Sequence, residues 1–202
     1  IVLQKTLEKI GIKKGNKLIN KESGRQISAI CPVHVFGNPA DSFKLKAIAD
    51  KWSLPMIEDA AEALGSFISN IHCGLIGDIG ILSFNGNKII TTGGGGALLF
   101  KNKELASRAR HLANTAKISH PYNFYHDEVG WNDRLPNLNA ALGVSQIETL
   151  NKKIELKKAL FLKYSEIFLD IPGISILKNN LSNSISNNWL ITLSINFQDL
   201  DK

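Results

Sequence analysis

An acid and an amine follow two apolar runs of the chain, in positions from which they could act together. Asp59 closes an extended run that begins at Pro55, and Ser83 nearly closes another run over residues 79–84, with Lys88 shortly after it. Ligands of open α/β sheets lie at the carboxyl ends of the strands, so these side chains could meet at one rim of a sheet. Pyridoxal phosphate needs a lysine for a Schiff base, an acid for its ring nitrogen and donors for its phosphate, and this set could supply them.

The same spacing is compatible with an interpretation that involves no cofactor. Lys88 could be an exposed lysine of a turn, and Asp59 could cap a helix. Spacing alone does not decide between the two, so the neighbouring segments must be considered as well.

The elements that would position these groups begin with a strand, a helix and a second strand. Residues 27–36 form a nearly continuous apolar run, which is typical of a parallel strand buried on both faces, although Pro32 lacks a hydrogen-bond donor. Asp41 can cap a helix that continues to about Trp52, and the run from Pro55 follows it. The pattern predicts one βαβ unit with a right-handed crossover.

The rest of the chain continues the α/β pattern. The expected elements are a short helix over residues 60–64, strands over 79–84, 88–92 and 97–100, and a helix over 103–113. The strands over 88–92 and 97–100 flank four glycines and are expected to pair as a hairpin. A polar, aromatic loop continues to Pro136.

The apolar positions also predict how the chain divides into domains. A roughly helical spacing over residues 137–168 indicates one long helix that connects two domains. We therefore expect a partial large domain over residues 1–136 and the beginning of a small α/β domain over 169–202. The chain opens without a methionine, so we expect it to be an interior piece of a longer protein.

Composition argues against several other classes of protein. The chain has 202 residues with 44% hydrophobic residues, which is typical of a globular fold. Most of the net charge of +6 lies in residues 1–25, without interleaved aromatic residues, so we expect no nucleic-acid partner. No apolar stretch is long enough to cross a membrane. Two cysteines are too few for a disulfide framework, so we expect a reducing, cytoplasmic setting. The five histidines lack zinc-like spacing, so we expect no metal.

Three segments, in order and at suitable distances, resemble the signatures of one known family. Residues 57–65 read IEDAAEALG, residues 83–92 read SFNGNKIITT and precede four glycines, and residues 130–143 read GWNDRLPNLNAALG. These three sequences closely resemble the sequence motifs of the DegT/StrS family of sugar aminotransferases. The likeness covers nearly the whole chain, more loosely in the first 25 residues and after about residue 170.

The resemblance implies a fold type I enzyme that uses pyridoxal phosphate to move an amino group from glutamate to a nucleotide-linked keto-sugar. The resemblance implies that Lys88 is the catalytic lysine of the Schiff base and that Asp59 is the catalytic partner of the pyridine nitrogen. It implies that Ser83 contacts the phosphate and that Glu62 lies near the ring hydroxyl. It also implies that Asn132 contacts the phosphate in the neighbouring subunit of a homodimer. His126 and Arg134 are the candidates for contact with the substrate.

Two segments of the sequence also resemble one subgroup of the family. Residues 32–38, PVHVFGN, and the Asn-Gly-Asn-Lys sequence that ends at Lys88 look most like the enzymes that aminate UDP-4-keto-6-deoxy-N-acetyl sugars. Trp131, Asp133 and Leu135 depart from the Tyr, Tyr and Met of relatives, which affects the shape expected for the subunit contact.

Other classes of function remain open at this point. One is a nucleotide-binding α/β module, although the chain has neither a Gly-x-Gly-x-x-Gly sequence nor a Walker sequence. Another is an inactive scaffold, because the family's upstream phosphate-binding segment and most of its small domain are missing and the piece alone is expected to be inactive. A related dehydratase is disfavoured because such relatives replace the lysine that is present here as Lys88.

Overall fold

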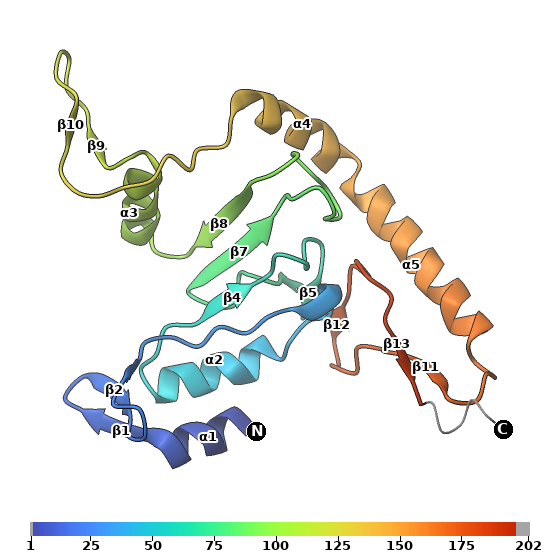
Figure 1. Cartoon of the computed structure of the whole chain (residues 1–202). Coiled ribbons are helices and arrows are strands. Elements are labelled where there is room, and N and C mark those ends of the chain that lie inside the picture. Colours follow the sequence, from blue (N-terminus) through green and yellow to red (C-terminus); the bar gives the residue numbers. More distant parts are fainter. Residues whose placement is uncertain (1, 197–202) are drawn as a thin grey trace.

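A three-stranded sheet near the middle of the chain carries the candidate catalytic residues at one rim. The computed structural model describes residues 2–196 (Figure 1), so the last six residues of the expected small domain lie outside the described part. The helices are α1 (Val2–Ile10), α2 (Ser42–Lys51), α3 (Lys103–Ala113), α4 (Asn137–Glu148) and α5 (Leu150–Ile167), with a 3-10 helix, η1, at Val35–Gly37.

The strands are short and form several small sheets. They are β1 (Gly11–Lys14), β2 (Lys17–Asn20), β3 (Gln26–Ile27), β4 (Ile57–Asp59), β5 (Phe67–Ile68), β6 (Ile71–His72), β7 (Ile79–Ser83), β8 (Gly96–Phe100), β9 (Lys117–Ile118), β10 (Tyr125–His126), β11 (Ile174–Ile176), β12 (Ser184–Ile185) and β13 (Leu193–Ile195). Their hydrogen-bonded orders are β1–β2–β3, β4–β7–β8, β12–β5–β6, β10–β9 and β11–β13. No helix among residues 2–196 combines the length and apolarity needed to cross a membrane.

The β4–β7–β8 sheet combines parallel and antiparallel pairing. β4 and β7 are parallel, with Asp59 opposite Ile81, whereas β7 and β8 are antiparallel, with Ser83 opposite Gly96. The predicted helix capped by Asp41 is confirmed, since Asp41 accepts a hydrogen bond from the backbone of Lys44, and β4 follows this helix as expected. Parallel pairing brings the ends of β4 and β7 to the same rim.

The run over residues 27–36 lies beside β4 but is interrupted as a strand. Ile30 and Val33 form isolated parallel bridges to Met56 and Asp59. Pro32 has no N–H to donate between these bridges, and the chain turns into η1 directly afterwards. The missing donor explains why the expected continuous strand is reduced to two bridges.

Two local predictions after β4 are wrong. Residues 60–64 form consecutive turns instead of a helix, with the backbone N–H groups of Ala63 and Ser66 bonding three residues back. Residues 88–92 form a loop, with bends at 88–90, instead of a strand, so the hairpin partner of β8 is β7. The backbone N–H of Thr92 donates to the carbonyl of Phe84, and Ile90 is buried, so loop packing overrides the β propensity of this segment.

The expected long helix is divided into α4 and α5 at Thr149. The Thr149 backbone ends α4 with φ −102° and ψ 3°, and its hydroxyl donates to the carbonyl of Gln146 at 3.0 Å. A threonine hydroxyl that bonds a nearby carbonyl competes with the helix ladder, which accounts for the interruption. In Figure 1 the two helices follow one another along one side of the molecule.

The segment after β11 returns to the first part of the chain. β12 pairs antiparallel with β5, with Ser184 opposite Ile68, while β11 pairs with β13. Figure 1 shows this segment running from β11 back toward β5. The boundaries drawn for the two domains remain a prediction, but residues 184–185 are hydrogen-bonded to the expected large domain.

A buried carboxylate holds β4 to the surrounding elements. Glu58 is fully buried and accepts hydrogen bonds from His34 Nε2 at 3.1 Å, Ser42 Oγ at 2.8 Å, and the backbone N–H groups of Ile76 and Gly77 at 2.8 and 2.6 Å. Burial raises the pKa of Glu58, but the hydrogen bonds from His34, Gly77 and Ser42 outweigh it and lower the pKa from about 4.5 to about 2. The histidine is therefore a buried core residue whose hydrogen bonds are satisfied.

We expect this carboxylate to make the protein sensitive to acid. Because the folded pKa of Glu58 is below the unfolded value, its contribution is present above about pH 4.5 and is lost as the pH falls toward 2, by about 3 kcal/mol. Urea unfolding between pH 7 and pH 2.5 measures this loss. Glu58→Gln should lower the free energy of unfolding at pH 7 by about 2–4 kcal/mol, because an amide N–H would face backbone donors. The same variant should also reduce the slope of the free energy of unfolding against pH in the acid range. Glu155→Gln, on the exposed face of α5, should leave the slope unchanged; equal slopes for both variants would contradict the assignment.

Candidate active site

Lys88 lies in the loop that connects β7 to β8 and is largely buried. Its backbone N–H bonds the carbonyl of Asn85, and only 13% of its side chain is exposed. The Lys88 ammonium lies 3.4 Å from Glu62 Oε1 and 4.2 Å from the centre of the Trp189 ring. The residue therefore sits in a turn, but it is not an exposed turn lysine.

Glu62 connects this lysine to η1. It follows β4 in the series of turns, and its second oxygen, Oε2, accepts the backbone N–H of Phe36 at 2.7 Å. The side chain is 23% exposed, so the ion pair with Lys88 is partly shielded from water. A carboxylate at this position is thus a counter-ion for the amine.

Asp59 and Ser83 end the two parallel strands at the same rim. Asp59 Oδ1 accepts the backbone N–H of Ala61 at 3.1 Å, as aspartate does in a turn, whereas its Oδ2 accepts no hydrogen bond from any residue between 2 and 196. Ser83 Oγ accepts the backbone N–H of Asn85 at 3.3 Å, and its own O–H donates to no group in the described part of the chain. One carboxylate oxygen and one hydroxyl proton are therefore open at this rim.

The donor set of this rim fits pyridoxal phosphate. An amine, a carboxylate oxygen without a partner and a hydroxyl with a proton to donate lie at the ends of β4 and β7 and in the loop that follows β7. These are the groups needed by an aldehyde, a pyridine nitrogen and a phosphate, respectively. Lys88, Asp59 and Ser83 would hold the three parts of the cofactor.

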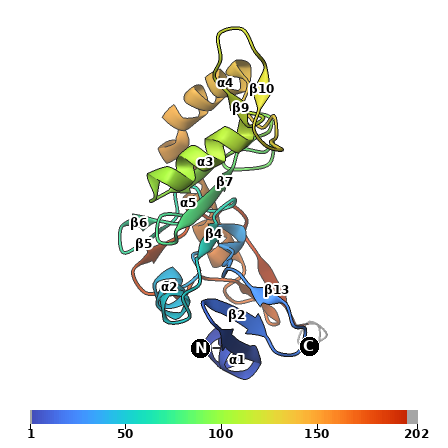
Figure 2. The same ribbon diagram turned by 90° about the vertical axis from the view of Figure 1, so that its left-hand side faces the viewer.

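The structure does not bring Asn132, His126 or Arg134 to this rim within one chain. Asn132 bridges Asn114 just after α3, and His126 Nδ1 in β10 donates to the carbonyl of Thr115 at 2.7 Å. Arg134 lines a cavity of about 430 Å³ with Gly94, Gly95 and Gly96, the last of which lies opposite Ser83, but it makes no hydrogen bond or ion pair with Lys88, Asp59 or Ser83 in the described part of the chain. Figures 1 and 2 both show the β9–β10 hairpin at the opposite end of the molecule from α1.

Sequence reasoning missed two residues of the rim, Asn187 and Trp189. The Trp189 indole N–H donates to the carbonyl of Asn87 at 2.8 Å, and Asn187 Nδ2 donates to the carbonyl of Glu62 at 2.8 Å. Both residues fall in the expected small domain, about a hundred positions after Lys88. The only signal in the sequence is a lone tryptophan in a polar stretch.

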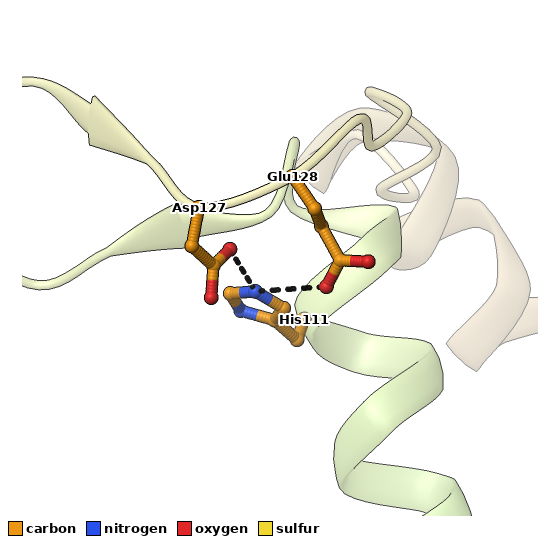
Figure 3. Close-up of side chains that lie close together, drawn as sticks. All are labelled: His111, Asp127 and Glu128. Carbon is orange, nitrogen blue, oxygen red and sulfur yellow. Dashed lines mark hydrogen bonds and ion pairs between the residues drawn. The ribbon is translucent and has the colours of Figure 1, made fainter.

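A second cluster of titratable side chains ties the β9–β10 hairpin to α3. His111 Nε2 lies 2.7 Å from Asp127 Oδ1 and 3.7 Å from Glu128 Oε1 (Figure 3). Arg108 binds both oxygens of Glu128 and thereby lowers the pKa of that carboxyl, while the hydrogen bond from His111 lowers the pKa of Asp127. The three ligand atoms lie within 4.8 Å of one another, but the guanidinium already neutralises Glu128, so ion pairing accounts for the arrangement.

Comparison with known proteins identifies the class. Residues 6–202 match the DegT/DnrJ/EryC1/StrS aminotransferase family, and the chain belongs to this family. Pyridoxal phosphate is therefore the cofactor that family membership indicates, and the fold is the fold type I aminotransferase fold expected from the sequence.

The curated relatives include the putative pyridoxal phosphate-dependent aminotransferase EpsN of Bacillus subtilis, which is 35% identical over 87% of this chain and 45% of its own length. A GDP-perosamine synthase of Vibrio cholerae is 29% identical over 91% of this chain and 49% of its own length. A UDP-4-amino-4,6-dideoxy-N-acetyl-beta-L-altrosamine transaminase of Campylobacter jejuni is 32% identical over 73% of this chain and 39% of its own length. The chain thus spans about half the length of the first two relatives.

Solved structures show the same fold. PseC of Helicobacter pylori, an aminotransferase involved in the biosynthesis of pseudoaminic acid, superposes with a TM-score of 0.84 and is 25% identical. The match covers 96% of this chain and 49% of PseC.

The ion-pair cluster predicts how firmly the hairpin is attached. Arg108→Ala should speed amide hydrogen exchange in residues 117–128 by about twofold to fivefold, the range for an exposed charge pair, without affecting the β4–β7–β8 sheet. Arg110→Ala, two residues further along α3 and therefore on the opposite face of the helix, is the matched control because its side chain makes no ion pair in the described part of the chain. Equal exchange in the two variants would show that Arg108 does not anchor the hairpin.

Proposed function

We propose that the protein containing this chain is a pyridoxal-phosphate-dependent aminotransferase that moves an amino group from glutamate to a nucleotide-linked keto-sugar. The observation that carries this proposal is the rim shared by Lys88, Asp59 and Ser83, in a chain that belongs to the aminotransferase family. The buried amine beside its counter-ion Glu62 supports the role of Lys88 as the residue that attaches the cofactor.

Each residue of the rim would have a separate role toward the cofactor. When bound, pyridoxal phosphate supplies a reactive carbonyl and an electron sink. The Lys88 amine would bind that carbonyl and, once released, carry a proton to and from the substrate carbon. Asp59 Oδ2 would accept the N–H of the pyridine ring and keep its proton in place, and the Ser83 hydroxyl would donate to the phosphate.

The hairpin end of the chain supports a proposal about the dimer. Asn132 lies next to Asn114 after α3, so it is not part of the rim formed by its own chain. A homodimer in which Asn132 reaches the phosphate in the partner's rim would give this residue its expected role. His126 and Arg134 would then contact the substrate from the same side. A cytoplasmic location remains a prediction.

For the substrate we propose a UDP-linked 4-keto-6-deoxy-N-acetylhexosamine. The wording of residues 32–38 and the Campylobacter relative support UDP, whereas the Vibrio relative is named for a GDP-linked sugar. Amination assays with the UDP, GDP and dTDP forms of the keto-sugar, with glutamate as the donor, compare these possibilities. Turnover confined to the GDP form would contradict the UDP proposal without affecting the proposed chemistry.

Lys88 should be the point of cofactor attachment. The complete protein mixed with pyridoxal phosphate should absorb at the edge of the visible range, and borohydride followed by peptide mapping should place the label on Lys88. Lys88→Met should abolish both signals, while Lys158→Met on the exposed face of α5 should keep them. A colourless protein, or a label on another residue, would contradict the assignment and favour a nucleotide-binding or scaffold role.

Asp59 should affect turnover more than attachment. Asp59→Asn should reduce kcat by at least about 10²-fold, as loss of a preorganised charge does elsewhere, because the amide no longer holds the ring proton. The label on Lys88 should persist in this variant. Asp50→Asn, an exposed carboxylate near the end of α2, should keep wild-type kcat. Wild-type turnover by Asp59→Asn would exclude the proposed role of this carboxylate.

A further inference from the structure

The return segment that ends at Trp189 forms a wall beside the candidate lysine. The Trp189 side chain is almost completely buried, and the centre of its ring lies 4.2 Å from the Lys88 ammonium. Glu62 contacts the same ammonium at 3.4 Å. The amine is thus held by an indole face and by a carboxylate, although the residues that supply them are more than a hundred positions apart.

Trp189 is fixed by hydrogen bonds on three of its groups. Its indole N–H donates to the carbonyl of Asn87, the residue before Lys88, at 2.8 Å. Its backbone N–H donates to Asn187 Oδ1 at 2.9 Å, and its carbonyl accepts the Lys157 ammonium from α5 at 2.9 Å. The ring therefore has little freedom to move away from the lysine.

Asn187 couples this wall to the turn that carries Glu62. It is fully buried, and its Nδ2 donates to the carbonyls of Glu62 and Leu64 at 2.8 and 2.9 Å. Its backbone N–H donates to Ser66 Oγ at 2.9 Å. The two groups that contact the amine are therefore held relative to one another by a single asparagine.

The physical consequence is that the amine is held in one place. A lysine side chain has four rotatable bonds and loses considerable rotamer freedom when it is ordered, so an unsupported amine would sample many positions. The aromatic face attracts the cation through its quadrupole and excludes water from one side, which strengthens the pair with Glu62. A bulky aliphatic side chain could fill the same space but would not attract the ammonium.

We propose that Trp189 is a positioning residue that holds the free amine of Lys88 in place for attachment of the cofactor. This inference rests on the proposed function and adds to it a residue from the far part of the chain. Trp189 acts through Lys88 and through the loop carbonyl of Asn87. The return of the chain past β12 to β5 is what places the indole there.

The first test measures the amine without any cofactor. In the complete protein, reductive methylation of Lys88 by formaldehyde and cyanoborohydride is followed by peptide mapping, with the exposed Lys158 as the internal reference. Trp189→Leu should raise the methylation rate of Lys88 by about fivefold, and Trp189→Phe, which keeps a ring face, should stay within about twofold of wild type. Trp52→Leu is the matched control, because that indole also donates a hydrogen bond, to the side-chain oxygen of Gln4, but lies at the end of α2.

The second test measures attachment by visible absorbance during titration with pyridoxal phosphate. Trp189→Leu should weaken apparent affinity by about fivefold, and Trp189→Phe should restore most of it. Circular dichroism and thermal unfolding establish that each variant is folded. If Trp189→Leu does not fold, a second pair of variants is used. Trp189→Met then takes the place of the leucine variant, which lacks a ring, and Trp189→Tyr takes the place of the phenylalanine variant, which keeps one.

The outcomes separate this inference from the proposed function. If wild-type protein never attaches the cofactor, the proposed function fails, and the methylation experiment still tests whether Trp189 holds the amine. If wild type attaches the cofactor on Lys88 but the leucine variant matches it in both experiments, the inference about Trp189 is wrong. Equal changes in the leucine and phenylalanine variants would also overturn it, because they would indicate a structural role without a contribution from the ring.

Discussion

Parallel pairing of β4 with β7 decides where Asp59, Ser83, Glu62 and Lys88 lie. The pairing places the end of β4, with Asp59, beside the end of β7, with Ser83, and both strands then lead into turns at the same rim. The turns after β4 carry Glu62, and the loop after β7 carries Lys88, so the ion pair between them is a consequence of the strand order. The buried Glu58 network fixes β4 to the elements around it and therefore supports the whole arrangement.

The rim is nevertheless completed by a part of the chain that lies far away in sequence. Trp189 and Asn187 come from the segment that follows β11 and returns to β5. Without this return, Lys88 would face solvent on the side that the indole now covers, and its ammonium would lose the contact with an aromatic face. The distinction between a large and a small domain is thus less sharp at the site than the order of the sequence suggests.

The hairpin end of the chain has a different relation to the site. Arg108 and His111 on α3 attach residues 127–128 by ion pairs, and the hairpin extends from this anchor toward one end of the molecule (Figures 1 and 3). Asn132 follows the same anchor. A residue held in this way does not belong to the rim of its own chain, which is why we propose that it serves a second subunit.

The sequence by itself determined the family, the α/β class, the capped helix after Asp41 and the identity of Lys88, Asp59, Ser83 and Glu62 as candidates. These features can be predicted from short segments, because apolar runs, a helix cap and sequence motifs are properties of residues that are neighbours in the chain. Tertiary structure decided the rest: residues 88–92 became a loop around the buried Ile90, the missing donor of Pro32 interrupted a strand, and Trp189 came to lie against Lys88. Contacts between distant segments depend on how the elements pack, and no local pattern of residues encodes that packing.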